Sequence, residues 1–136
     1  MRAPLALAVV LLVTACGGGD NGSPTEPQPL TLTGTWAGTI VDSVGGHGTV
    51  RATVRQDGNQ VTGTWAATFT DPRGNNGGSL SGTVNGSAVS LTLYGPNEGV
   101  CPFRVTATWS GDRLTGTYAA FSCTTAITGS LDLRRQ

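Results

Sequence analysis

Lysine is absent from this 136-residue sequence, and only 12% of its residues are charged. The chain therefore has no basic block of the kind that binds nucleic acid or an anionic membrane surface. His47 is the only histidine, and the acidic residues are scattered, so neither metal-ligand spacing nor a catalytic carboxylate pair is present. We expect no nucleic-acid partner, no metal, no cofactor and no enzymatic activity.

Long apolar runs are also missing, apart from one at the N-terminus. Arg2 precedes an apolar stretch, residues 3–13, which is too short to span a bilayer comfortably. The stretch ends in Val13-Thr14-Ala15-Cys16, which resembles the lipobox of bacterial lipoproteins. The resemblance implies that residues 1–15 are a signal peptide and that Cys16 becomes the acylated first residue. An ordinary secretory signal cut near Ala15 is the alternative.

The resemblance also implies a cellular location. Gly17, and not aspartate, follows Cys16, and in Gram-negative lipoproteins this implies the outer membrane. Several acyl chains together give stable membrane attachment, whereas one alone is marginal. We expect a cell-envelope protein, anchored in the membrane through Cys16 and facing the periplasm or the cell surface.

A short polar segment separates this anchor from the rest of the chain. Residues 17–29 contain no hydrophobic side chain and are dominated by glycine and proline, a composition that favours a disordered tether. We assign residues 16–30 to the lipidated cysteine and linker, and residues 31–136 to one folded domain. With residues 1–15 removed, seven arginines oppose eight acids, a formal charge of −1.

The chain has few cysteines, and their number fits this assignment. Of the three, Cys16 goes to the lipid, which leaves Cys101 and Cys123 as an even pair in an oxidising compartment. We predict a disulfide that closes a loop of roughly 20 residues and contributes about 3 kcal/mol. Two unpaired thiols are the alternative.

No segment after residue 30 shows a helical period, and the pattern is instead a strict apolar–polar alternation. Threonine fills many of the polar positions, as suits the solvated face of a strand. The pattern predicts an all-β domain with eight strands, at residues 31–41, 48–56, 59–69, 78–84, 87–94, 102–110, 113–121 and 125–134.

Three of the expected connections are tight hairpins. Asp57-Gly58, Asn85-Gly86 and Gly111-Asp112 each suit a two-residue turn. The resulting registers place apolar residues opposite one another, and they pair Val54 with Val61, Leu80 with Leu91 and Trp109 with Leu114. The third register puts Cys101 opposite Ser122, so we predict a bulge at residues 120–122 that brings Cys123 opposite Cys101 and turns Phe121 inward.

Loop lengths suggest how the strands assemble. The three tight turns share one end of the domain, here the closed end, and the longer connections share the other, the open end. Pairing the last strand with the first removes both exposed edges. We predict an eight-stranded antiparallel up-and-down β-barrel, a size whose interior is filled or holds one small ligand. A two-sheet sandwich is the alternative.

A short motif of apolar, glycine and apolar residues recurs on the inner face. It appears as Leu32-Thr-Gly34-Thr-Trp36, Val61-Thr-Gly63-Thr-Trp65 and Leu114-Thr-Gly116-Thr-Tyr118. Inward glycines let strands bend and approach closely. We predict an aromatic plug at the closed end, formed by Trp36, Trp65, Trp109 and Tyr118. The plug would be ordinary core packing or, alternatively, a stacking site for a flat ligand.

The Gly34-Thr-Trp36 phrase on the first of eight strands resembles the calycins, the group that contains the lipocalins and avidins. The resemblance implies a ligand-binding barrel in which a late arginine, Arg134 or Arg135, packs over Trp36 as a cation–π contact. Ala37-Gly38-Thr39 stands where avidins carry polar biotin contacts, so we predict no biotin binding. The C-terminal helix that lipocalins usually add is also not predicted.

The open end is the candidate site. Its predicted interior is apolar and suits a small hydrophobic ligand, with contacts from Ile40, Phe69, Leu93 and Phe103. His47 or Arg73, from two rim loops, would gate or orient the ligand. The interior is either open or packed shut. A packed interior favours a second hypothesis, a protein-interaction or inhibitor module whose rim loops grip an envelope protein.

Overall fold

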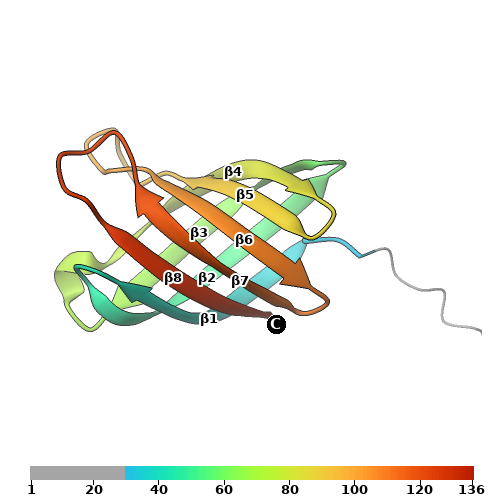
Figure 1. Cartoon of the computed structure of the whole chain (residues 1–136), viewed down its shortest axis with the longest axis horizontal. Coiled ribbons are helices and arrows are strands. Elements are labelled where there is room, and N and C mark those ends of the chain that lie inside the picture. Colours follow the sequence, from blue (N-terminus) through green and yellow to red (C-terminus); the bar gives the residue numbers. More distant parts are fainter. Residues whose placement is uncertain (1–29) are drawn as a thin grey trace, which may run out of the picture.

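A computed structural model describes residues 30–136, which form a closed eight-stranded antiparallel barrel (Figure 1). The strands are β1 (Gly34–Asp42), β2 (Gly46–Asp57), β3 (Gln60–Phe69), β4 (Asn76–Asn85), β5 (Ala88–Leu93), β6 (Phe103–Ser110), β7 (Arg113–Ala120) and β8 (Thr128–Arg135), with a short 3₁₀ turn, η1 (Pro72–Gly74), before β4. Each strand pairs with the next, and β8 pairs with β1. The predicted up-and-down barrel is confirmed, and the sandwich is excluded.

The lipobox, Cys16 and nearly all of the predicted tether lie outside the described residues. No helix in the described part of the chain has the length and hydrophobicity needed to cross a membrane.

The alternation seen in the sequence produces one apolar core along the barrel axis. The inward positions hold buried aliphatic and aromatic side chains, and no polar or charged residue among those described is buried. The outward positions carry threonine, serine and arginine. Closing the sheet removes its edges, so a barrel of this length needs no covering helix.

The tight turns differ in part from expectation. Gly111-Asp112 is confirmed, but the other two turns are Gly58-Asn59 and Gly86-Ser87. Consequently Val54 pairs with Gly63, and not with Val61, and Leu80 pairs with Leu93, and not with Leu91. The reason is backbone geometry: the first residue of all three turns is a glycine with φ of 57–59°, which is the pattern of a type II′ turn. The shift is two residues, so every side chain keeps its predicted face.

The predicted disulfide is confirmed, while the bulge is not. Cys101 and Cys123 are bonded with their Cα atoms 5.8 Å apart. The β6–β7 ladder stays in register to its last pair, and the Phe121 N–H still donates to the Pro102 carbonyl at 3.1 Å. Phe121 therefore faces outward, where the Arg104 guanidinium lies 4.8 Å from its ring centroid. The one-residue offset between Cys101 and Cys123 is accommodated at Ser122, whose backbone has a φ of 58°, and not by a bulge in β7.

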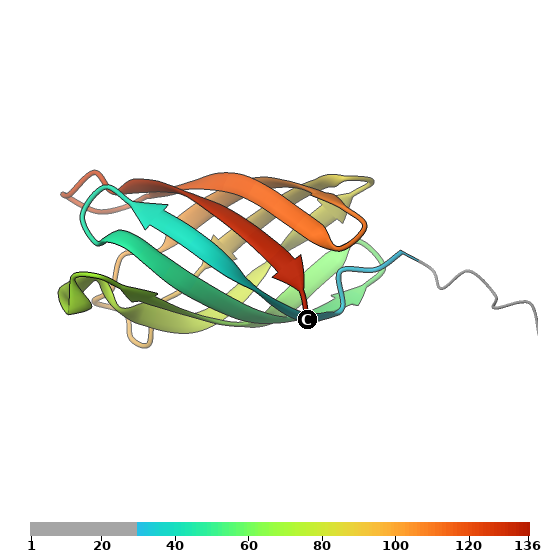
Figure 2. The same cartoon turned by 90° about the horizontal axis from the view of Figure 1, so that it is seen from below.

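The first described residues cross the closed end and seal it. Leu32 and Trp36 are each 1% exposed, and the Trp36 indole N–H donates to the Leu32 carbonyl at 2.9 Å. Figure 2 shows the start of the described chain and the C-terminus at this same end. The Arg135 guanidinium lies 4.5 Å from the Trp36 ring centroid and donates to the carbonyls of Thr31 and Thr33. The end is thus held by both termini of the domain.

Arg134, one of the two arginines expected to pack over Trp36, faces the other way. Leu131, Leu133 and Arg135 share the inward face of β8, so the intervening Arg134 points outward. Its guanidinium forms an exposed ion pair with Asp112 at 3.4 Å. Arg135 is therefore the one of the two arginines that packs over Trp36.

The predicted plug of four aromatic residues does not form. Trp36 and Trp109 lie at the closed end, where the Trp109 indole N–H donates to the Gly86 carbonyl at 2.8 Å. Trp65 and Tyr118 stand five residues beyond their turns, about 16 Å along the strand, which carries them into the open half. The motif glycines do permit close approach: a Cβ on Gly63 would lie 2.0 Å from the Thr53 carbonyl oxygen, and one on Gly116 would lie 2.4 Å from that of Thr106. Gly34 has a φ of 142°.

Candidate ligand-binding site

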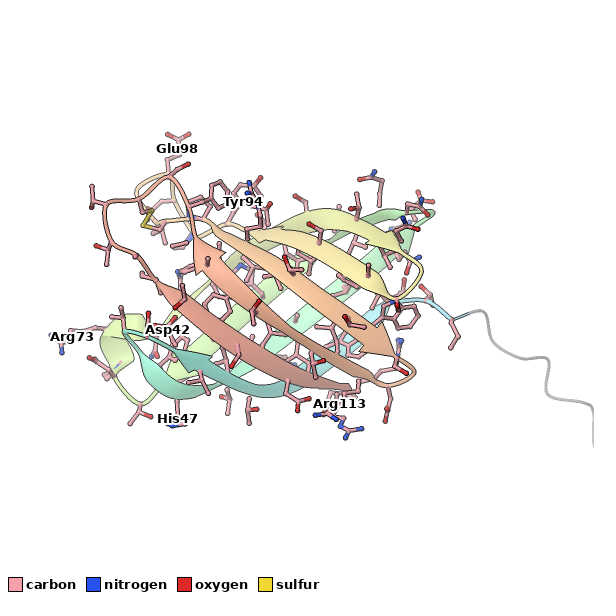
Figure 3. The ribbon with its side chains drawn as sticks, in the orientation of Figure 1. Asp42, His47, Arg73, Tyr94, Glu98 and Arg113 are labelled. Atoms are coloured by element: carbon pink, nitrogen blue, oxygen red, sulfur yellow. A yellow bond between two sulfur atoms is a disulfide. The ribbon has the colours of Figure 1, made fainter. Side chains whose placement is uncertain are left out.

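The open end of the barrel holds a cavity of about 360 Å³. Its mouth is framed by the β1–β2 turn, by η1 and by the loops that join β5 to β6 and β7 to β8 (Figure 3). Below the cavity the core retains a void of only about 40 Å³. The two outcomes left open by the sequence therefore occupy different halves: the closed half is packed, and the open half has a volume in the range of small-molecule sites.

Most of the predicted contact residues line this cavity. Ile40, Leu93 and Phe103 form its wall, and Phe69 and Arg73 stand at its mouth. His47 is the exception. It pairs with Val41, an outward position between Ile40 and Asp42, and its exposed side chain lies on the outer surface (Figure 3). The alternation of β2 therefore removes His47 from the site.

Three aromatic rings form one continuous wall. The Phe103 ring meets Trp65 edge to face at 6.3 Å and Tyr118 edge to face at 5.6 Å between centroids. The Trp65 indole N–H donates to the Tyr94 carbonyl at 3.1 Å, so its polar atom is satisfied. The three rings present a mainly apolar surface to a ligand, and the π faces of aromatic rings also attract cations.

The cationic side chain at the mouth, Arg73, already forms an ion pair. Arg73 donates to both carboxylate oxygens of Asp71, at 3.1 and 2.9 Å, and these hydrogen bonds hold the pKa of Asp71 below its usual range. The Arg73 side chain is 90% exposed and points away from the barrel (Figure 3). It stands at the rim beside its partner acid.

Asp42 is a site residue that the sequence analysis missed. Its Oδ1 atom accepts the N–H groups of Val44 and Gly45 at 2.7 and 2.8 Å, and its Oδ2 atom accepts the Tyr118 hydroxyl at 2.7 Å. Asp42 lines the cavity where β1 ends. The alternation contained the signal, because Trp36, Gly38, Ile40 and Asp42 occupy every second position of one inward face. The sequence analysis treated the acids only as scattered residues without a catalytic pair.

Tyr118 reaches Asp42 across a glycine. On β8, Gly129 pairs with Tyr118 on one side and with Asp42 on the other. A Cβ on Gly129 would lie 2.2 Å from the Tyr118 ring, so the missing side chain is what lets the ring cross β8. Burial, followed by the hydrogen bond to Asp42, raises the pKa of Tyr118. The hydroxyl therefore remains a protonated donor at physiological pH.

The disulfide lies at the edge of the cavity. Cys101 contributes to its lining, and the bond to Cys123 ties the β5–β6 loop to the β7–β8 loop. Within residues 30–136 no group of three or more histidine, cysteine or acidic side chains is close enough to hold a metal ion. The site is thus an apolar, aromatic cup with one fixed carboxylate and a cross-linked rim.

Comparisons with known proteins identify the fold. No family model matches the chain, and no curated protein matches it. Two solved structures are similar to it: EF1p2_mFAP2b bound to DFHBI (TM-score 0.67, 18% identity, 77% of this chain and 94% of that one) and a redesigned beta barrel, mFAP1, also bound to DFHBI (TM-score 0.63, 21% identity, 76% and 94%). At these identities the likeness concerns the fold alone, a closed eight-stranded antiparallel barrel.

Proposed function

We propose that this protein is a lipid-anchored binding protein of the cell envelope, which takes one small and mostly apolar molecule into the open end of its barrel without catalysis. The observation that carries the proposal is the cavity of about 360 Å³, walled by Ile40, Trp65, Leu93 and Phe103. Both similar barrels hold a small molecule, DFHBI. The interaction-module hypothesis required a filled interior, so the cavity favours binding of a small ligand.

The lipid anchor is proposed on the lipobox resemblance at Cys16, and the fold is compatible with it. Leu30, the first described residue, leads into the sealed end of the barrel. A tether attached there leaves the opposite end free for a ligand. Replacing Cys16 with alanine should release the protein from the membrane fraction and abolish incorporation of labelled palmitate. Retention of both would overturn the anchor.

The binding proposal is tested with N-phenyl-1-naphthylamine, a neutral apolar dye whose fluorescence rises in a dry site. We expect saturable binding by the wild type and loss of binding in Phe69→Glu, because the charge would stand at the cavity mouth. Phe121→Glu is the matched control: it makes the same substitution on the outer face and should bind as the wild type does. Equal binding by both variants, or no binding by the wild type, would contradict the proposal.

Native mass spectrometry of protein from an oxidising periplasm complements the titration. A small molecule that leaves on collisional activation would give the mass of the natural ligand. A clean apo mass from protein that also fails to bind the dye would return the interaction-module hypothesis to first place.

A further inference from the structure

Asp42 has no cationic partner in the described structure. The three ion pairs among residues 30–136 join Arg73 to Asp71, Arg113 to Asp132 and Arg134 to Asp112. All the donors to Asp42 are neutral: two backbone N–H groups and one phenol hydroxyl. A carboxylate has about four lone-pair positions, so Asp42 can accept a further hydrogen bond. Its charge is stabilised by hydrogen bonds but not cancelled.

The other groups of the cavity leave this charge dominant. The second charged side chain in the lining, Arg73, is directed to Asp71. Tyr118 is a neutral donor, and its hydroxyl already donates a hydrogen bond to Asp42. The remaining lining includes the three-ring wall of Trp65, Phe103 and Tyr118. An acceptor carboxylate in a cavity with apolar, aromatic walls favours a molecule that carries one cationic group on a hydrocarbon body.

We propose that the cavity selects apolar molecules that carry a single protonated amine, with the ammonium group at the Asp42 carboxylate and the hydrocarbon part against Trp65 and Phe103. This inference rests on the proposed binding function and names its ligand class. An ammonium supplies both a hydrogen-bond donor and the opposite charge to the carboxylate. The apolar remainder of the ligand fills the space above the packed core.

The same geometry discriminates against anions. A carboxylate or phosphate head group in this cavity would face Asp42 without an unpaired cation to offset the repulsion. Like-charge contacts in a binding site are a common source of specificity. Fatty acids and other apolar anions should therefore be the poorest ligands of this barrel, although their chains match the walls as well as those of amines do.

A matched series of ten-carbon probes tests the proposal in the wild-type protein. Decylamine, decanol and decanoate differ only in the head group, and each is made to compete with N-phenyl-1-naphthylamine at neutral pH. We expect decylamine to bind about tenfold more tightly than decanol, because its ammonium donor carries the charge opposite to the carboxylate whereas the decanol hydroxyl is a neutral donor, and decanoate to bind most weakly. Decanol or decanoate binding as tightly as decylamine would overturn the proposal.

Asp42→Asn removes the charge and keeps an oxygen for the backbone N–H groups. We expect it to reduce decylamine affinity to that of decanol, with decanol little changed. Asp112→Asn is the matched control, since it removes the same charge at the closed end and should keep the amine preference. Asp42→Ser also removes the charge and keeps an oxygen for the backbone N–H groups, so it should lose the preference too and provides a second variant if Asp42→Asn does not fold.

The outcomes separate the two proposals. If the dye binds and all three probes displace it equally, the binding function stands and the amine selectivity fails. If neither the dye nor any probe binds, the binding function itself fails. Loss of the amine preference in Asp112→Asn as well as in Asp42→Asn would assign the selectivity to overall charge and would also overturn the proposed role of Asp42.

Discussion

The two ends of this barrel are built from the same alternating strands but differ in almost everything else. At the closed end, two-residue turns and the segment before β1 leave Leu32 and Trp36 each 1% exposed. At the open end, longer loops surround a cavity of about 360 Å³. The comparison teaches that alternation alone does not decide whether a barrel is filled. What covers each end decides it.

The polar groups divide in the same way. At the closed end, Arg135 satisfies backbone carbonyls and packs on Trp36, so its charge holds structure together. At the open end, Asp42 is held by neutral donors and keeps an acceptor position. One end is arranged for stability and the other for an incoming molecule. This division can be broken by substitutions made in matched pairs.

The largest expected effect is at Trp36. Trp36→Ala should lower the free energy of unfolding by about 3–5 kcal/mol, because it opens a cavity in the sealed end. Phe69→Ala, at the half-buried mouth, should cost only about 1 kcal/mol. Urea unfolding followed by circular dichroism measures both. Similar losses at the two positions would contradict the contrast between a packed end and an open one.

The disulfide should be the main stabilising element of the open end. Replacing Cys101 and Cys123 together with serine should cost about 3 kcal/mol, because the unfolded chain regains the entropy of a closed loop. It should also weaken dye binding, since two rim loops become independent. Reductant should bring the wild type to the stability of the variant and leave the variant unchanged. Reductant-insensitive stability of the wild type would refute the prediction.

A smaller effect separates the two C-terminal arginines. Arg135→Ala should cost about 1–2 kcal/mol, because it removes hydrogen bonds to the carbonyls of Thr31 and Thr33 and the cation–π contact with Trp36. Arg134→Ala removes only an exposed ion pair and should cost at most about 0.5 kcal/mol. Thermal unfolding of both variants gives the comparison, and a larger loss from Arg134→Ala would refute it.

The smallest effect appears only at alkaline pH. The pKa of Tyr118 is raised in the folded protein, whereas an unfolded tyrosine titrates near pH 10, so above about pH 10 the unfolded state binds fewer protons. Stability from this group is complete below that pH and falls as the pH rises further. The unfolding free energy of the wild type should therefore drop more steeply above about pH 10 than that of Tyr118→Phe. Parallel curves would contradict the shift.

Much of the barrel could be predicted because its signals are local. The alternation fixes which side chain faces inward, and the Cys101–Cys123 pair follows from counting cysteines once Cys16 is set aside on the lipobox resemblance. Two hairpin registers were wrong by two residues, since such a shift leaves every residue on its face and the alternation cannot detect it. The backbone of Gly58 and Gly86, with φ near 58°, settled those registers.

The candidate site was predicted in its apolar part and missed in its polar part. Ile40, Phe69, Leu93 and Phe103 follow from strand position and apolar character, and they line the cavity. The Asp42–Tyr118 hydrogen bond joins residues 76 positions apart across Gly129, a contact that no local pattern contains. His47 was placed at the rim by its glycine-rich surroundings, but its strand turns it outward.

By itself the sequence determined the β class, the eight strands, the inward face and the disulfide, because alternation and residue chemistry act within a few positions. Closure of β1 on β8 was predicted from the need to remove two sheet edges, and the tertiary structure excluded the sandwich alternative. The split of the interior into packed and open halves was decided by tertiary structure alone. Tertiary structure also decided that Arg135, and not Arg134, packs over Trp36, and that the Asp42 carboxylate lines the cavity. These features depend on the register between strands that are far apart in the chain. They also depend on Gly129, whose missing side chain leaves room for the Tyr118 ring of the neighbouring strand.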